Sequence, residues 1–236
     1  MVRGYTDGMV KKILFLEGPI QTGKSTLIRA CLGEHLSECG GFTSQRLIGP
    51  DGNTRGFRLC PASAPLTAPA EGIAGEDIAG EGFADGVFRY FRADGVFKYF
   101  RADGVFKYFR PEGPAYQDQQ VFDRLGVQLL EASKNTPLIL LDEVGGSELL
   151  REPFRKKLDE VLGSGVPCLG VLKLYENARR LERSYQDAPI ARANLELRRQ
   201  ITEDLGGTVL YYDRLGDPAG AAAAADAVGQ FVHSIF

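Results

Sequence analysis

The residues that most constrain the architecture run from Lys12 to Leu36. They enclose the loop Gly18-Pro19-Ile20-Gln21-Thr22-Gly23-Lys24-Ser25-Thr26. The apolar run Ile-Leu-Phe-Leu precedes this loop and Leu-Ile-Arg-Ala-Cys-Leu follows it, which predicts a buried strand, a glycine loop and a helix. The spacing Gly-x-x-x-x-Gly-Lys-Ser at that junction is typical of a loop that binds phosphate groups. An ordinary glycine turn that caps a helix is the alternative, and it needs neither the lysine nor the strand.

Each fixed position of this loop has a chemical reason. Gly18 and Gly23 permit backbone angles and close approaches that a Cβ atom would block. The loop amides and the N-terminus of the helix then face one anion. We expect Lys24 to contact the β- and γ-phosphates, as a catalytic residue, and the Ser25 hydroxyl to bind Mg²⁺. The sequence therefore predicts that residues 18–26 bind ATP or another nucleoside triphosphate.

The composition is that of an ordinary globular chain. Among 236 residues, 44% are hydrophobic and the net charge is -3, which argues against a nucleic-acid partner. The four cysteines have no metal-ligand spacing, and we infer a reducing, cytoplasmic location with no membrane partner. We expect residues 1–8 to be frayed and residues 9–236 to form one domain, with an insertion at about 61–113. The sequence leaves the oligomeric state open.

Strand and helix patterns alternate along most of the chain. A hairpin is predicted at 42–60, a helix at 117–134, buried strands at 137–141 and 166–174, and a helix at 147–162 with Ser147 as its cap. Helices broken near Pro189 are expected within 176–205, followed by a strand at 208–212 and a helix at 219–231. This order predicts an α/β fold with a mainly parallel sheet and helices on both faces.

Residues 61–110 interrupt that order. Ala, Pro, Gly and Glu dominate residues 61–83, which predicts a flexible loop. The nine-residue segment at 84–92 then recurs at 93–101 and 102–110, with Lys98 and Lys107 in place of Arg89. Its Asp-Gly pairs and aromatic residues predict a small β-meander with one apolar face. Alternatively, its interleaved aromatic and basic residues bind single-stranded nucleic acid.

A pair of acidic residues follows the strand at 137–141. Ligands of open α/β sheets lie beyond the carboxyl ends of the strands, so we expect Asp142 to bind Mg²⁺ together with Ser25. Glu143, one residue on, is the candidate that orients or deprotonates the attacking water. Developing negative charge calls for a further cation. Six basic residues are candidates for that role, each with a solvated surface charge as the alternative: Arg46, Arg55, Lys173, Arg179, Arg180 and Arg183.

These motifs resemble a family of small P-loop nucleoside-triphosphatases first described from thermophiles. The matching segments are residues 18–26, Gly-Phe-Thr at 41–43 with Arg46, Arg-Gly-Phe at 55–57, and Asp-Glu-Val-Gly at 142–145 followed by Glu148-Leu149. Val144 and Ser147 depart from the family's Ile and Met, and residues 61–110 have no counterpart. The resemblance implies a RecA-like fold of the catalytic-glutamate class. It also implies Mg²⁺-dependent hydrolysis of nucleoside triphosphates to diphosphate and phosphate, with broad base tolerance.

Two other functions remain compatible with the sequence. One is a kinase that transfers phosphate to a nucleoside, a nucleotide or another small acceptor, with the arginines near 179–183 as a lid. The other is a nucleotide-dependent binding module whose basic aromatic insertion grips RNA or a protein. No Asn-Lys-x-Asp stretch of the guanine-reading type occurs, so strict selectivity for GTP is not indicated.

Overall fold

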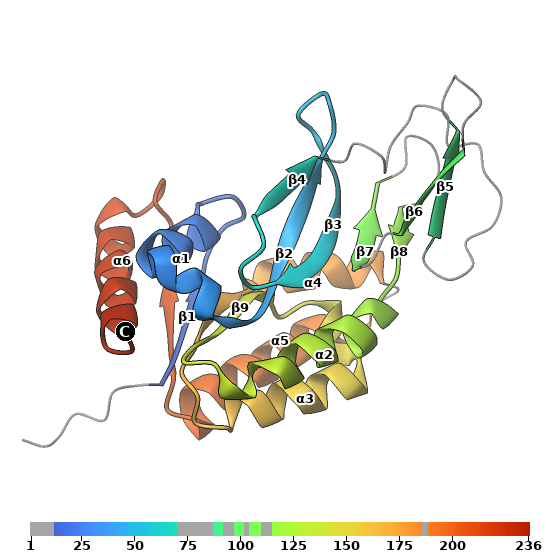
Figure 1. Ribbon diagram of the computed structural model, residues 1–236. Helices are drawn as coiled ribbons and strands as arrows, with labels where there is room; N and C mark the ends of the chain where they lie inside the picture. The colour runs from blue at the N-terminus through green and yellow to red at the C-terminus, as the bar shows by residue number, and fades with distance from the viewer. Residues whose placement is uncertain (1–11, 70–86, 92–96, 102–103, 110–114, 186–187) are drawn as a thin grey trace, which may run out of the picture.

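A computed structural model describes residues 12–69, 87–91, 97–101, 104–109, 115–185 and 188–236 (Figure 1). The centre of the molecule is a sheet whose five parallel strands lie in the order β11-β1-β10-β9-β2. Their bounds are Thr208–Tyr211, Ile13–Glu17, Cys168–Leu172, Ile139–Val144 and Gly40–Ile48. The prediction of a mainly parallel α/β sheet is confirmed. Because parallel strands end at one edge, the segments after β1, β9 and β10 meet there.

Antiparallel strands extend this sheet beyond β2. The predicted hairpin is confirmed, since β2 pairs with β3 (Thr54–Pro61) from Phe42 opposite Pro61 to Ile48 opposite Thr54. Next come β7 (Val105–Tyr108) and β8 (Tyr116–Gln117). Outside this strand order, β4 (Thr67–Pro69) pairs in parallel with the second half of β2. The segment predicted as a flexible loop from residue 61 therefore contains a short strand, because the free groups of β2 accept one.

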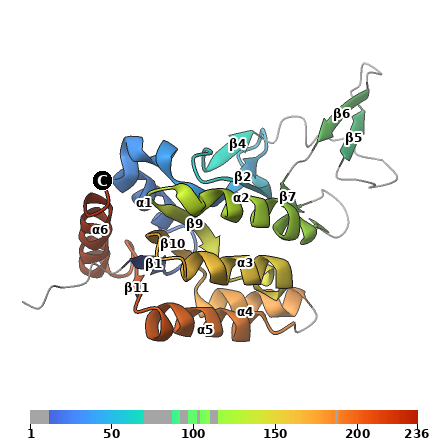
Figure 2. The same cartoon turned by 60° about the horizontal axis from the view of Figure 1, so that its bottom comes forward.

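Helices cover both faces of the sheet, as predicted. Leu14 and Leu16 pack with α1 (Lys24–Leu32) and α6 (Pro218–His233), whereas Ile13 and Phe15 face the opposite layer. That second layer contains α2 (Val127–Ala132), α3 (Glu152–Leu162) and α5 (Ile190–Arg199), with α4 (Tyr175–Ser184) packed on α5. Figure 2 shows α1 and α6 apart from the group of α3, α4 and α5. The alternation of side chains along β1 thus divides the core into two layers.

The helix predicted at 147–162 is in fact two elements. A 3₁₀ turn covers Ser147–Leu150, and α3 begins only at Glu152. Pro153 stands in the first turn of α3, where the missing N–H costs nothing, but the same residue cannot continue a helix from the preceding turn. Ser147 caps no helix; its hydroxyl donates to the Gln119 side chain instead (2.9 Å).

The three copies of the repeat do not form one meander. β5 (Val87–Phe91) and β6 (Phe97–Arg101) pair only with each other among the described residues, in an antiparallel sheet of two strands. The third copy supplies β7, which pairs with β3 in the main sheet. Val105 and Tyr108 are buried there beside Leu47. The prediction of a meander is therefore wrong for the third copy, because burial of its side chains against the core stabilises β7 more than pairing with another copy of the repeat would.

Several predictions fall wholly or partly outside the described residues. They are the frayed segment 1–8, most of the low-complexity stretch and the Arg-Ala-Asp-Gly turns of the repeat. The other predicted strands and helices agree with the structure to within a few residues, although Gln117 belongs to β8 and a short π-helix (Phe122–Gly126) precedes α2. In the part of the chain that the structure describes, no helix is both long enough and apolar enough to cross a membrane.

Candidate functional site

The loop after β1 turns in two steps that only glycine permits. Gly18 has φ = 151°, and a Cβ atom there would lie 2.1 Å from the Tyr212 carbonyl oxygen. Gly23 has φ = 93° and directly precedes α1. The Thr22 hydroxyl lies 3.1 Å from the Pro19 carbonyl oxygen, inside the loop, and 3.4 Å from that of Tyr212. The segment after β11 thus packs against the loop, and α1 begins directly after Gly23.

Lys24 folds over this loop. Its Nζ atom donates to the carbonyl oxygens of Gly18 (3.0 Å) and Pro19 (2.5 Å). Burial lowers the pKa of Lys24, an effect that the nearby Glu143 carboxylate opposes. The ammonium group is therefore held at the mouth of the loop, where it can also reach an oxygen anion bound to the amides.

Ser25 and Asp142 meet across the sheet. The Ser25 hydroxyl donates to Asp142 Oδ1 (2.6 Å), and the Thr43 hydroxyl donates to Asp142 Oδ2 (2.9 Å). Only 4% of Asp142 is exposed, and this burial raises the pKa of its carboxyl group despite both hydrogen bonds. Three segments far apart in the sequence thus converge on one carboxylate that has no cation hydrogen-bonded to it among the described residues.

This group of oxygen atoms suits Mg²⁺. Magnesium prefers hard oxygen ligands and is usually bound by one or two carboxylates together with substrate phosphates. A buried carboxylate without a cation is costly unless a positive charge compensates it. In the part of the chain that the structure describes, no group of three or more His, Cys, Asp and Glu side chains could hold a metal alone. The residues present therefore fit an ion that a substrate helps to bind.

Glu143 has a different partner from Asp142. It forms an ion pair with Lys173, which directly follows β10, at 2.5 Å from Nζ to Oε1. The Glu143 side chain is 39% exposed and that of Lys173 is 19% exposed. Burial opposes ionisation of Glu143, but Lys173, Lys24 and Arg46 together lower its pKa. Glu143 is thus held as an anion, partly open to water, beside the loop.

Two buried polar residues fix the backbone around that ion pair. Glu148 Oε1 accepts from the amides of Gly145 and Gly146, both at 2.7 Å. Asn194, on α5, donates to the carbonyl oxygens of Gly145 (3.0 Å) and Lys173 (2.9 Å). Asn194 is 1% exposed and therefore ties the segment after β9 to the one after β10. The relative position of Glu143 and Lys173 depends on these four hydrogen bonds.

The six candidate cations occupy different places. Lys173 pairs with Glu143, and Arg46 is within electrostatic range of Glu143. Arg55 pairs instead with Asp51 in the turn of the hairpin (2.8 Å). Arg179, Arg180 and Arg183 are exposed on α4, and no described contact joins them to Lys24 or Glu143. The structure therefore brings two of the six candidates to the site.

Comparison with known proteins finds a family match over one part of the chain. A sequence model of the family described as NTPase matches residues 87–205, which is half of the chain. The chain belongs to the NTPase family. The matched segment of this NTPase includes Asp142, Glu143, Lys173 and Asn194, so it covers the whole glutamate side of the site. Hydrolysis of nucleoside triphosphates in general follows from that membership, and the fold is the mainly parallel α/β sheet described above.

A structural relative is THEP1 from the hyperthermophile Aquifex aeolicus, known from a crystal structure. It is 16% identical to this NTPase, the match covers 76% of this chain and 95% of the THEP1 chain, and the TM-score is 0.41. No curated protein matches the sequence.

Two residues of the site have no role that the sequence predicts. Thr43 lies in a segment that carries the family resemblance, but neither Thr43 nor Asn194 has a fixed spacing to the loop, because the sheet and α5 bring them to the site in space rather than in sequence. For Thr43, the signal available was its place on a strand next to the one that carries Asp142. For Asn194, it was an amide on the apolar face of an amphipathic helix.

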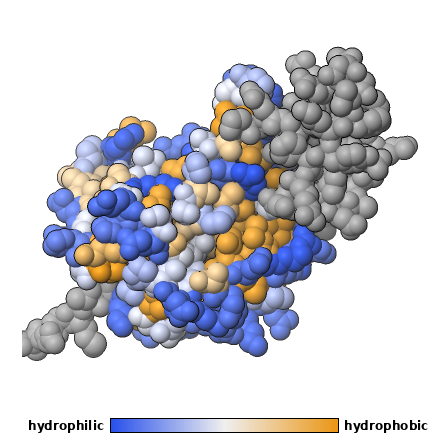
Figure 3. Space-filling view, viewed as in Figure 1, coloured by the Kyte–Doolittle hydropathy of each residue, from blue (hydrophilic) through white to orange (hydrophobic). Residues whose placement is uncertain are grey.

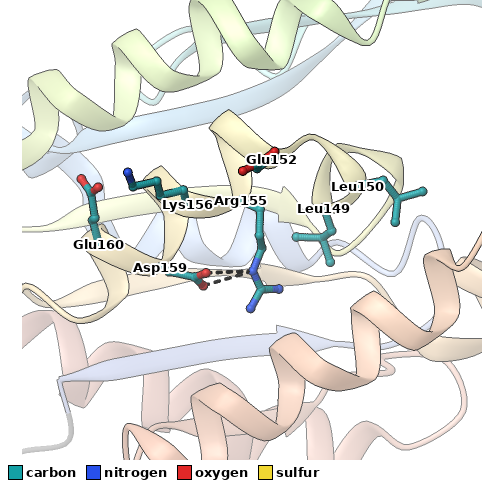
Figure 4. A pocket seen from close by; sticks show the side chains of 7 residues that line it. All are labelled: Leu149, Leu150, Glu152, Arg155, Lys156, Asp159 and Glu160. Atoms are coloured by element: carbon teal, nitrogen blue, oxygen red, sulfur yellow. Dashed lines mark hydrogen bonds and ion pairs between the residues drawn. The ribbon is translucent and has the colours of Figure 1, made fainter.

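A shallow depression of about 600 Å³ lies elsewhere, along α3 and the turn before it (Figure 4). Its side chains are Leu149, Leu150, Glu152, Arg155, Lys156, Asp159 and Glu160. Arg155 and Asp159 form an ion pair within it (3.1 Å). None of these residues belongs to the loop or to the strand ends of this NTPase, so the depression is separate from the site.

Proposed function

We propose that this chain hydrolyses nucleoside 5′-triphosphates to diphosphate and phosphate, with Mg²⁺ and with broad base specificity. One observation carries the proposal. The Ser25 hydroxyl after the phosphate loop lies 2.6 Å from the Asp142 carboxylate at the end of β9. A loop that binds phosphates and a carboxylate suited to Mg²⁺ therefore form one site, as phosphoryl transfer requires.

The loop side binds the triphosphate. The backbone N–H groups of residues 20–24 and the N-terminus of α1 bind the β- and γ-phosphate oxygens, and Lys24 neutralises the charge that develops on them. The described hydrogen bonds of Lys24 are all to the loop itself, at Gly18, Pro19 and Thr22, so the exchange of one of them for a phosphate oxygen needs only a small rearrangement. Ser25 and Asp142, supported by Thr43, would hold the metal. When bound, Mg²⁺ screens the β- and γ-phosphate charge and fixes their orientation.

The glutamate side activates water. The Glu143 carboxylate accepts a hydrogen bond from the attacking water and orients it toward the γ-phosphorus atom. Lys173 holds this carboxylate ionised and in place, and is the cation best placed to approach the transferring group. The order of β1, β10 and β9, with one strand between the loop strand and the acidic strand, supports a RecA-like fold of the catalytic-glutamate class. We include in the proposal a single domain over residues 9–236 and a cytoplasmic location.

Phosphate release is the experiment that tests this function. Purified protein is incubated with Mg²⁺ and each of ATP, GTP, CTP and UTP, without any acceptor, and free phosphate is measured over time. We expect release from all four within about tenfold of one another, and none when EDTA removes the metal. A parallel set with labelled ATP and a panel of nucleosides and nucleotides detects transfer. Labelled acceptor without free phosphate would replace hydrolysis by a kinase reaction.

A further inference from the structure

A row of side chains crosses three strands beside Glu143. Arg46 on β2 lies opposite Phe57 on β3, and Phe57 lies opposite Lys107 on β7. Residues directly opposite one another point to the same face of a sheet. Arg46 is four residues from Phe42, which belongs to the core layer of α2 and α3, so the row lies on that face. Two cations thus flank an aromatic ring on the face of the sheet that carries α2 and α3.

The third copy of the repeat is firmly fixed in this position. The Leu59 amide donates to the Gly104 carbonyl oxygen and the Phe109 amide to that of Arg55, both at 2.7 Å. Between these two bonds, Val105 is 2% exposed. The register of β7, and with it the place of Lys107, is therefore set by the main sheet.

The surroundings of Lys107 are aromatic and positively charged. Its Nζ atom lies 5.2 Å from the centre of the Phe109 ring, and Phe57 packs against Phe106 and Phe109. Figure 3 shows hydrophobic surface gathered in this part of the molecule, between β3 and α2. Burial lowers the pKa of Lys107, and the charge of Lys173 lowers it further. Lys107 and Lys173 are thus within electrostatic range of each other, and their charges repel.

Two of the cations at this place have no ion pair. The only described ion pair of Lys173 is with Glu143, and in the described part of the chain neither Arg46 nor Lys107 forms an ion pair. The carboxylates of Glu148 and Asp142 also act on Lys173, but Glu148 accepts from two glycine amides and Asp142 from two hydroxyls. Arg46 and Lys107, unpaired and partly shielded from water, favour the binding of an anion.

We propose that Arg46, Lys107 and Lys173 form an anion subsite beside Glu143 that binds a phosphate group. Cationic N–H donors around one point match the oxygens of a phosphate dianion, which form strong charge-assisted hydrogen bonds. The group is either the phosphate released from the γ-position or the phosphate of a second substrate. The inference rests on the proposed function in that the subsite adjoins the nucleotide site. It makes the third repeat copy part of the site.

Equilibrium binding of inorganic phosphate tests the subsite. Isothermal titration calorimetry of the full chain, with Mg²⁺ and ADP present, gives the Kd for phosphate. We expect Lys107→Ala to weaken it about tenfold and Lys107→Arg to stay within about twofold of wild type. The repeat offers a matched control, since Lys98 has the same neighbours in sequence but lies on β6, which pairs with β5. Lys98→Ala should leave the Kd unchanged.

The second and third copies are identical in sequence, so one can replace the other next to β3. The double variant Lys98→Ala/Lys107→Ala removes the lysine from both copies, so that neither copy can place a lysine next to β3. Phosphate affinity within twofold of wild type in the double variant overturns the proposal. A tenfold loss in the double variant supports it, whether or not Lys107→Ala alone shows the loss. Circular dichroism of each variant confirms that the chain is folded.

Two further arms identify the source of the phosphate and separate this proposal from the function. If AMP binds more tightly than inorganic phosphate in a Lys107-dependent way, a second substrate is the source; equal or weaker AMP binding indicates released phosphate. Binding needs no turnover. A chain that binds phosphate through Lys107 but releases none from triphosphates keeps the subsite and loses the hydrolase function. A chain that hydrolyses triphosphates but shows no Lys107-dependent phosphate binding keeps the hydrolase function and loses the subsite.

Discussion

The site has a loop side and a glutamate side, and they are built differently. On the loop side, residues 18–25 are consecutive, and their own backbone angles and amides create the binding surface. On the glutamate side, Glu143 lies near the end of β9 and Lys173 directly follows β10, and Asn194 on α5 holds these two strand ends together. The first side is therefore local and self-sufficient, whereas the second depends on tertiary packing. We therefore expect the loop side to respond mainly to substitutions within the loop, and the glutamate side to respond also to substitutions of residues that lie outside it in sequence.

The largest effect is expected on the loop side. Lys24→Ala should lower phosphate release at least about a thousand-fold, because one charge that stabilises the transferring oxygens is lost. Its contacts are confined to the loop, so the thermal unfolding midpoint should hardly change. Phosphate release and thermal denaturation are measured together, with the exposed Lys12→Ala as control. Wild-type turnover in Lys24→Ala would remove the loop from the mechanism.

Next comes the reactive group of the glutamate side. Glu143→Gln should lower kcat at least about a hundred-fold, the usual scale for an acid–base group, while Mg²⁺–nucleotide binding is retained. Binding is measured by titration with a fluorescent nucleotide and kcat by phosphate release. Glu152→Gln, an exposed carboxylate on α3, serves as the control. A loss of only twofold would show that Glu143 does not orient the water.

Asn194 tests whether the glutamate side is controlled from a distance. Asn194→Leu leaves the carbonyl oxygens of Gly145 and Lys173 without their donor. We expect kcat to fall about tenfold with little change in KM, and stability to fall by about 1–3 kcal/mol. Steady-state kinetics and urea denaturation measure the two, with Leu195→Ala on the same helix as control. Lost stability with an unchanged kcat would mean that Asn194 has a structural role alone.

A smaller effect is expected where the two sides meet at Asp142. Thr43→Val removes the hydroxyl that donates to Oδ2, and one hydrogen bond contributes about 1 kcal/mol. The Mg²⁺ concentration for half-maximal activity should therefore rise about fivefold. Thr43→Ser retains the hydroxyl and should resemble wild type. A wild-type Mg²⁺ requirement in Thr43→Val would show that the hydroxyl does not matter, and a change in Thr43→Ser alone would show that the methyl group does.

The smallest effect is expected outside both sides. Deleting residues 84–101 removes β5 and β6, whose described pairing is with each other, and should leave kcat within about twofold. Deleting residues 84–110 also removes β7 and should lower both stability and turnover. Phosphate release and thermal denaturation compare the two deletions. Equal losses in both would mean that the first two copies also support the site.

The sequence indicates the parallel sheet, both helical layers and the hairpin, because each depends on a local pattern of apolar residues. It also singles out Lys24, Ser25, Asp142 and Glu143, since a glycine loop and a strand end are marked by short motifs. Their roles stay predictions until the variants above are measured.

What the sequence does not show is governed by contacts between distant residues. The Thr43 hydrogen bond to Asp142 requires that β2 and β9 be neighbours, and the position of Asn194 requires the packing of α5. The repeat is the clearest case. Three nearly identical segments predict three identical strands, yet the third pairs with β3 in the main sheet and the other two pair with each other. Local propensity makes each segment a strand, and the available partner strand determines which sheet it joins.

That division has a consequence for the number of copies. An unpaired strand presents a row of free N–H and C=O groups, which invites association with other chains. With one copy in the main sheet, the remaining two satisfy each other. A chain with one copy fewer would leave a single strand with both edges open, because no second copy would remain to pair with it. Loss of one copy should therefore lower the solubility of this protein more than loss of two.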